Sequence, residues 1–533
     1  MARSALRLTV SLLLLIASLT TAAAQFDPAK VPPQAAGVAA LYPAPRVTYS
    51  TPSFAPGRAD FTSHAELTAF LAATTEGVAH VALRTMGRSQ EGRAIAAAIF
   101  AQGSLDIAAL RRNGRPSVLI IGQQHGNEPA GGEAALVIIE RLARGDLAAL
   151  VDKINVVVVP RANPDGAEAF RRTTTSGIDL NRDHALARTP EARVLIGLMR
   201  ELDPALVIDA HEFSVIGAWV RNFGGLARPD VLIQAATQAN LTPAIALLQD
   251  GTFLPALRNA FDAQGLVHDW YFFGDRDPKV VNMGGIEPEL ARNAGGLRHA
   301  ASILIETRGI GIGRTNWKRR VFAHVTAMET ALHVAAKNAL ALNVARDESR
   351  RFDLVRDSAR MLVVRARPTP ERRDMVFVDP VNGALRTVSV DWRSSLTLVP
   401  EVTRSRPWGY VLPPSAANAA ARLVELGIAV DRLGAQAKLT VEHYRTLGIE
   451  RGAGDTIQGR FELEKGEAAI PVGSFLVTLD QRLATLAALL LEPDSDSGYV
   501  AHRLVALDGG DRVPILRITD VPDTHVLALQ PLQ

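Results

Sequence analysis

The sequence predicts an α/β fold in which a mixed, mostly parallel central sheet is flanked by helices. Residues 117–121 and 154–159 form continuous apolar runs rich in β-branched side chains, and residues 131–143 between them carry apolar side chains at helical spacing. A strand without alternation of polar and apolar residues is buried on both faces, as in a sheet covered by helices. Strand, helix and strand in this order form the basic unit of α/β proteins.

Length and composition limit the classes of protein to consider. With 533 residues, the chain exceeds what one hydrophobic core usually supports, so we expect two or three domains. The net charge of +3 is small for this length and no block of lysine and arginine occurs, which excludes nucleic acid as a partner. The absence of cysteine excludes thiolate metal ligands and cysteine nucleophiles.

The N-terminus has the pattern of a secretory signal peptide. Arg3 and Arg7 precede an apolar run at residues 12–16, and small residues follow up to Ala24. An uncleaved membrane anchor is the alternative, but the run is short for a hydrocarbon core of about 30 Å. We therefore expect removal of residues 1–24 and an exported protein, periplasmic or secreted, that is not stably inserted in the membrane after cleavage.

The next segments can be taken in chain order. Residues 25–60 are rich in proline and alanine and are expected to form an extended lead-in. A helix is expected over residues 64–71 because Ser63 suits its N-cap, and strands are expected at 81–85 and 95–100. A long helical pattern at residues 317–346 closes a first domain, which we assign to residues 61–346.

The C-terminal part has a different character. Its short strand-like runs are separated by proline and glycine and lie at residues 361–365, 375–378 and 385–390. A helical segment follows at residues 416–426. We therefore expect residues 350–533 to form an accessory region of mixed α/β structure.

His125 and Glu128 are a candidate pair of metal ligands. They follow the strand at residues 117–121 in a glycine-containing loop, ahead of a helix that begins near Pro129. A histidine and a glutamate three residues apart can bind one Zn²⁺, but a catalytic zinc needs about three protein ligands and one open position. By itself the pair is a weak signal, and an ordinary surface loop is the alternative.

Two further buried strands are followed by polar residues. The strand at residues 205–210 runs into His211, and the strand at residues 302–305 runs into Glu306. In open α/β sheets, functional sites gather at the carboxyl ends of the strands. We therefore expect His211 and Glu306 to lie close to the first pair.

The order of these motifs resembles one known family. Between Glu128 and His211 lie an N-P-D-G motif at residues 163–166, an arginine pair at 171–172 and a D-x-N-R motif at 179–182. This succession, closed by His211 and Glu306, is similar to that of the zinc carboxypeptidase family, peptidase family M14. The resemblance covers about residues 60 to 340 and implies a catalytic domain there.

The resemblance implies specific roles in binding zinc and moving protons. Three side chains would bind one zinc ion per chain, namely His125, Glu128 and His211. Glu306 would be the general acid/base that takes a proton from the attacking water and returns it to the leaving amine. An ion pair with Arg308 or Arg314 is the structural alternative for Glu306. Asp179 would accept a hydrogen bond from the ring nitrogen of His125 that does not bind the metal.

The resemblance also implies contacts with substrate. Asn181 and Arg182 match the pair that binds the free α-carboxylate of a peptide, which a guanidinium can hold through two hydrogen bonds. Arg172 matches the arginine that polarises the scissile carbonyl, with its neighbour Arg171 as the alternative. One departure concerns Tyr271, which lies farther from Glu306 than the family's usual tyrosine does and is left outside the catalytic set, because core packing explains it equally well.

The remaining histidines receive structural interpretations. His184 lies near the expected carboxylate-binding pair but outside the matched positions. His299 and His324 are expected on helical or loop surfaces.

Three functions follow from these patterns. We favour an exported zinc metallopeptidase that hydrolyses the C-terminal peptide bond of peptides with a free carboxylate. The first alternative is a zinc amidase that acts on cell-wall peptides or N-acyl amino acids, because an exported enzyme meets peptidoglycan. The second is an inactive peptide-binding protein with the same fold, against which the presence of both Glu306 and Arg172 argues.

Overall fold

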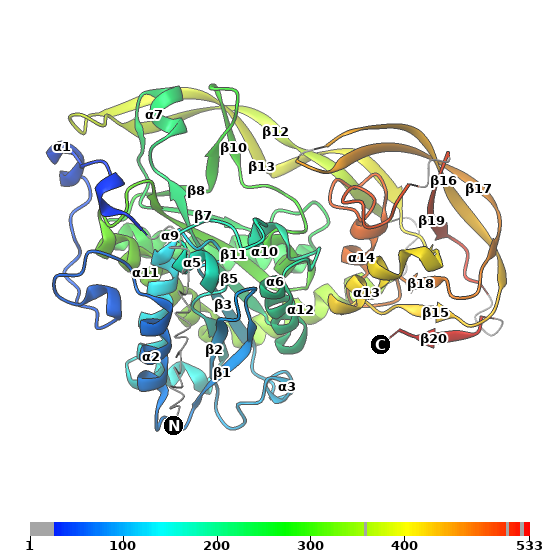
Figure 1. Ribbon diagram of the computed structural model, residues 1–533, viewed down its shortest axis with the longest axis horizontal. Coiled ribbons are helices and arrows are strands. Elements are labelled where there is room, and N and C mark those ends of the chain that lie inside the picture. The colour runs from blue at the N-terminus through cyan, green and yellow to red at the C-terminus, as the bar shows by residue number, and fades with distance from the viewer. Residues whose placement is uncertain (1–25, 356–359, 453, 508–510, 523–526, 533) are drawn as a thin grey trace, which may run out of the picture.

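The structure is a computed structural model that describes residues 26–355, 360–452, 454–507, 511–522 and 527–532 (Figure 1). The expected signal peptide, residues 1–24, lies outside the described residues. Across the described ranges, no helix combines the length and the apolar character needed to cross a membrane.

An eight-stranded sheet in the order β1-β2-β4-β3-β5-β11-β7-β8 forms the centre of the molecule. Its strands are β1 (Val81–Arg88), β2 (Ala94–Phe100), β3 (Ser117–Gly122), β4 (Asn155–Val159), β5 (Leu206–Ser214), β7 (Val231–Ala235), β8 (His268–Trp270) and β11 (Ala301–Ile310). The central strands β4, β3, β5 and β11 run parallel, whereas β1, β2 and β7 add antiparallel neighbours. The predicted α/β fold with a mixed central sheet is therefore confirmed.

Helices cover both faces of this sheet, which explains its continuous apolar strands. Val118 and Ile120 of β3 belong to the core beneath α4 (Pro129–Arg144) and α11 (Trp317–Lys337). Leu119 and Ile121 point to the opposite face, into the core that includes α6 (Pro190–Leu202). Successive side chains of a strand face opposite sides, and each fully buried aliphatic side chain stabilises the fold by about 1.5–3 kcal/mol.

Further helices lie before residue 356 in the described part of the chain. They are α1 (Ala36–Ala40), α2 (His64–Thr75), α3 (Ile107–Leu110), α5 (Pro164–Glu168), α7 (Ala218–Phe223), α8 (Pro243–Leu248), α9 (Leu254–Ala263), α10 (Ala291–Leu297) and α12 (Ala339–Leu354). Ser63 caps α2 as expected, and Glu66 completes a capping box. The single helix expected over residues 317–346 is instead α11 followed by α12, with a break at Asn338. Also, α12 continues across residues 346–350, the expected limit of the first domain.

A second sheet joins distant parts of the chain in the order β6-β12-β13-β10-β9. Its strands are β6 (Leu226–Ala227), β9 (Phe272–Gly274), β10 (Val280–Met283), β12 (Met361–Val378) and β13 (Leu385–Ser405). The short runs expected after residue 360 therefore merge into one long hairpin, which reaches back over the central sheet (Figure 1). Pairing of β13 with β10 and of β12 with β6 attaches this hairpin to the segment before residue 346.

The C-terminal part contains a third sheet in the order β17-β16-β19-β14-β18-β15-β20. Its strands are β14 (Gly409–Leu412), β15 (Asp431–Leu433), β16 (Ala437–Arg451), β17 (Ile457–Ile470), β18 (Phe475–Thr478), β19 (Arg512–Ile518) and β20 (Leu529–Pro531), accompanied by α13 (Ala417–Glu425) and α14 (Ala484–Leu491). Leu423 of α13 and Leu489 of α14 share one hydrophobic core with Leu195 and Met199 of α6. This region therefore buries apolar surface of the first domain.

Candidate active site

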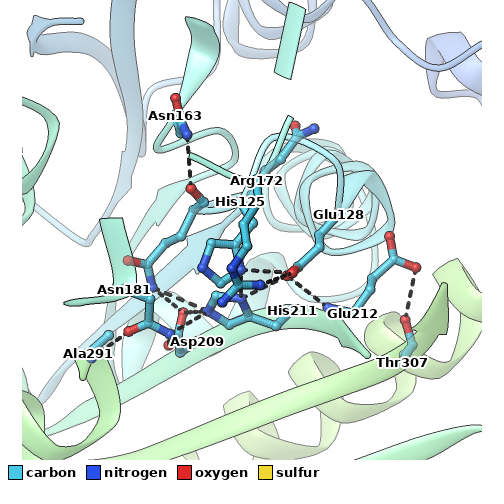
Figure 2. Close-up of polar contacts among 12 residues, drawn as sticks. His125, Glu128, Asn163, Arg172, Asn181, Asp209, His211, Glu212, Ala291 and Thr307 are labelled. Atoms are coloured by element: carbon cyan, nitrogen blue, oxygen red, sulfur yellow. Dashed lines mark hydrogen bonds and ion pairs between the residues drawn. The ribbon is translucent and has the colours of Figure 1, made fainter. Parts of the chain in front are cut away.

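Three buried side chains converge at the carboxyl end of β3. His125 lies in the loop after β3, Glu128 directly precedes α4, and His211 belongs to β5. His125 Nδ1 lies 2.8 Å from Glu128 Oε1, His211 Nδ1 lies 2.9 Å from Glu128 Oε2, and the two Nδ1 atoms are 3.1 Å apart (Figure 2). Their potential ligand atoms all lie within 4.8 Å of one another.

The N-P-D-G motif holds the loop that carries His125. Asn163 Nδ2 donates to the carbonyl of Gln124 at 3.2 Å, while its Oδ1 accepts from the amide of Gly166 at 2.9 Å. The loop packs so closely on α5 that a Cβ on Gly126 would lie 1.9 Å from the carbonyl carbon of Gly166. Glycine is therefore required at position 126, and the motif positions a candidate ligand rather than contacting it.

This donor set fits a zinc ion. His125 Nε2 lies 2.9 Å from Asp179 Oδ1, and His211 Nε2 lies 2.9 Å from Asp209 Oδ1. A carboxylate on the distal nitrogen selects the tautomer whose Nδ1 is free to bind a metal. Burial alone would raise the pKa of Glu128, but His125 and His211 outweigh it and hold that pKa well below its usual range. A deprotonated carboxylate and two imidazoles match the ligands of zinc.

Asp209 belongs to this site although the sequence analysis did not single it out. It lies two residues before His211 in β5, so both side chains face the same side of the sheet. Its Oδ1 also accepts a hydrogen bond from Gln124 Nε2 at 2.5 Å, and Gln124 Oε1 lies 2.7 Å from His184 Nε2. The D-x-H spacing within a predicted strand is the signal that would have identified Asp209.

The expectation that His299 and His324 lie on surfaces is wrong. Both are buried, and His324 Nε2 lies 3.1 Å from the carbonyl oxygen of His211. Burial lowers the pKa of His324 to about 3, so its ring is neutral near pH 7. His299 Nδ1 lies 2.7 Å from Ser349 Oγ of α12. His324 lies on the buried side of α11, whereas His299 lies in the loop between α10 and β11 and is covered by α12.

Glu306 of β11 lies beside His211 in the register of the parallel pair β5–β11. Both strands continue beyond these residues, to Ser214 and Ile310, so the expectation that the strands end there is wrong. Burial, together with the charge of Glu128, raises the pKa of Glu306 to about 8. Within the described ranges Glu306 has no ion pair, and Arg308 donates instead to Asn316 Oδ1 at 3.0 Å.

A cavity of about 350 Å³ opens next to this group. Its lining includes all four residues expected to act on the substrate, which are Arg172, Asn181, Arg182 and Glu306. Arg172 lies 3.1 Å from Glu128 Oε1 and 3.0 Å from Asp179 Oδ2. Arg171 does not line the cavity, and its nearest acidic partner is Glu91 at 3.9 Å. The geometry therefore favours Arg172 over its neighbour.

Asn181 and Arg182 are held by the backbone around them. Asn181 Oδ1 accepts from the amide of Ala291 at 2.8 Å (Figure 2), and Arg182 Nη1 donates to the carbonyl of Asn181 at 2.8 Å. Tyr271 lines the same cavity together with Phe272, and it also packs against the hydrophobic core that contains Phe272.

Comparison with known proteins agrees with this geometry. The sequence model of a protein family described as Zinc carboxypeptidase matches residues 67–215, the segment that contains all three candidate ligands. Over this segment the chain is similar to the zinc carboxypeptidase family. The match supports a metallocarboxypeptidase, a hydrolase, as the class of enzyme that this segment resembles.

Relatives with this family name extend beyond the matched segment. Carboxypeptidase 2 of Trichophyton rubrum is 28% identical over 414 residues, which are 75% of this chain and 76% of that protein. Carboxypeptidase D of Mus musculus is 29% identical over 194 residues, which are 29% of this chain and 14% of that protein. Among solved structures, a metallo-carboxypeptidase from Burkholderia cenocepacia is 18% identical with a TM-score of 0.40, covering 52% of this chain and 69% of that chain.

Proposed function

We propose that this chain is an exported zinc metallopeptidase that removes the C-terminal residue of peptides. One observation carries the proposal: a single cavity is lined by His125, by Glu306 and by the Asn181–Arg182 pair. A peptide whose terminal carboxylate is bound by Arg182 would place its last peptide bond in the same enclosed space as Glu306. A site of this kind favours chain ends, because an internal peptide bond has no carboxylate to offer.

Each polar group then has a defined task. His125, Glu128 and His211 would hold zinc, which acts, when bound, as a Lewis acid toward water and the substrate carbonyl. Glu306 accepts a proton from the attacking water and delivers it to the nitrogen of the leaving residue. Its raised pKa of about 8 reflects a buried carboxyl that can exist in both protonation states near neutral pH.

Arg172 and Asp179 complete the arrangement. The guanidinium of Arg172 is placed to donate to the carbonyl oxygen as negative charge develops there, because its contacts with Glu128 and Asp179 hold it next to the ligands. Asp179 orients the ring of His125 through the 2.9 Å contact with Nε2. These side chains are positioned before substrate arrives, which avoids the cost of ordering them during the reaction.

Purified protein lacking residues 1–24 tests the proposal. We expect about one zinc ion per chain and release of free amino acids from the C-terminus of short peptides. A chelator should abolish this release, and added zinc should restore it. Zinc-loaded protein that releases no amino acid from any peptide with a free carboxylate would refute the proposal. A parallel assay with muropeptides and N-acyl amino acids would identify an amidase instead. Recovery of the processed protein outside the cytoplasm would test export.

A further inference from the structure

Arg292, the second residue of α10, is a buried cation in the wall of the same cavity. Its side chain is 2% exposed, Nη2 donates to the carbonyl of Gly285, and Nε has no hydrogen-bond partner among the described residues. Burial lowers the pKa of Arg292, but a guanidinium remains charged at physiological pH. A buried charge without a counter-ion is costly, so a site that retains one indicates an anionic ligand.

The other charges of the cavity show which cations are available to a ligand. The cavity is lined by three arginines, of which Arg172 is paired with Glu128 and Asp179. Arg182 and Arg292 donate to backbone carbonyls and form no ion pair with any residue that the structure describes. Two guanidinium groups are therefore free to bind anions, whereas the α-carboxylate of a peptide needs only one of them.

Acidic side chains in the cavity wall do not neutralise Arg292. Glu212 is paired with Arg320, and Glu306 faces the candidate zinc ligands. Glu287 lines the cavity but has no ion pair within the described residues. Burial and the nearby charge of Glu289 raise the pKa of Glu287, while Arg182 and Arg292 act in the opposite direction. The cavity wall therefore supplies no ion-pair partner for Arg292 among the described residues, and a carboxylate of a ligand can take that place.

The position of Arg292 is linked to that of the carboxylate-binding pair. The amide of Ala291, the preceding residue, donates to Asn181 Oδ1 (Figure 2). Gly284 allows its backbone to pack closely against Arg292 and Tyr271. A Cβ at position 284 would lie 2.7 Å from both Arg292 Nη2 and Tyr271 Cδ1. The carbonyl of Gly284 accepts from Ser395 Oγ of β13 at 2.9 Å. The arginine is therefore held by α10 and by the hairpin β12–β13 at a defined place beside Asn181.

We propose that Arg292 binds the side-chain carboxylate of the substrate's last residue, so that peptides ending in glutamate or aspartate are preferred. The inference rests on the proposed function, since Arg182 must already bind the α-carboxylate. A terminal acidic residue presents two carboxylates, and the cavity presents two arginines without acidic partners. A neutral or basic terminal residue would leave the guanidinium of Arg292 buried without a counter-ion.

Matched peptide substrates test this selectivity. We expect kcat/KM for a peptide ending in glutamate to exceed that of the same peptide ending in glutamine by at least about tenfold, which corresponds to ~1.4 kcal/mol. Arg292→Met should reduce this ratio to near one, and Arg292→Lys should keep part of the ratio. A wild-type ratio near one would overturn the proposal. Equal loss on all peptides in Arg292→Met would do so as well, by assigning Arg292 to the α-carboxylate.

A binding measurement separates this inference from the proposed hydrolysis. Calorimetric titration of the zinc-loaded protein lacking residues 1–24 compares L-glutamate with L-glutamine, two ligands that differ only in the side-chain carboxylate. Tighter binding of L-glutamate by at least about tenfold, lost in Arg292→Met, supports the inference even if no peptide is cleaved. Peptide hydrolysis without any preference for L-glutamate would leave the proposed function intact and overturn the role of Arg292. If Arg292→Met fails to fold, the wild-type titrations and Arg292→Lys decide.

Discussion

Glu306 lies directly beside His211 across the parallel strands β5 and β11. Neighbouring strands are about 4.8 Å apart, so backbone hydrogen bonds of the sheet, rather than a loop, set the distance between the proposed proton carrier and a proposed zinc ligand. Sites built on strands are more precise than sites built on loops. Because Glu306 and His211 lie on different strands, the effects of single substitutions on zinc binding and on catalysis can be measured separately.

Replacing a candidate ligand should remove zinc and activity together. His125→Ala or His211→Ala leaves two protein ligands where about three are needed, so we expect little zinc after dialysis and no measurable hydrolysis. Metal analysis and a peptide assay on the same sample check this. His333→Ala is a matched control, because the His333 side chain is 54% exposed and lies in the C-terminal part of α11. Normal zinc content in the His125 or His211 variant would remove that residue from the site.

Glu306→Gln should separate zinc binding from catalysis. The amide has nearly the same shape as the carboxyl group but does not carry a proton between water and the leaving nitrogen, so kcat should fall by about 10²-fold or more. Zinc content should stay at the wild-type level. A parallel loss of zinc would show instead that Glu306 is a ligand.

Asp209→Asn should weaken zinc binding without abolishing it. The amide retains the size of the side chain but no longer stabilises the tautomer of His211 that leaves Nδ1 free, so zinc affinity should fall by about 10–100-fold. Competition with a chromogenic chelator measures the affinity. Asp262→Asn provides the control, because the Asp262 side chain is 72% exposed and pairs with His268. Unchanged affinity in Asp209→Asn would contradict the assigned contact.

Arg182 can be tested with amidated substrate. If this guanidinium binds the α-carboxylate, C-terminal amidation should lower kcat/KM by at least about tenfold, because charge-assisted hydrogen bonds contribute ~1.5–3 kcal/mol. Arg182→Met should cause a similar loss on the free acid and little further loss on the amide. Additive losses would show that Arg182 serves another part of the site.

A fragment of residues 25–345 should be unstable. Removing the C-terminal part exposes Leu195 and Met199 of α6, which pack with α13 and α14, and leaves β10 without its partner β13. Exposed apolar surface and an open strand edge favour aggregation. Solubility, thermal unfolding and activity of the fragment, compared with residues 25–533, check this. A folded and fully active fragment would show that the C-terminal part is dispensable.

Local patterns were sufficient to predict much of the site. His125, Glu128, Asn181 and Arg182 lie in short sequence motifs, and the strand before His125 can be predicted from its apolar residues. The apolar run of β5 likewise leads to His211. Asp209 could also have been predicted, because residues two apart on a strand share a face. The helix covering the sheet was predicted, but its break at Asn338 was not, since a helical pattern continues on both sides.

The sequence by itself determined the α/β class and indicated the candidate ligands and the candidate proton carrier, because these depend on periodic burial and on closely spaced motifs. Only the tertiary structure decided that Tyr271 and Arg292 face the cavity, and that β12 and β13 extend into one hairpin. These features result from pairing between segments far apart in the chain, such as β13 with β10. Residue spacing carries no information on which distant surface covers a given side chain, so Arg292 could be recognised as an unpartnered charge only in the folded chain.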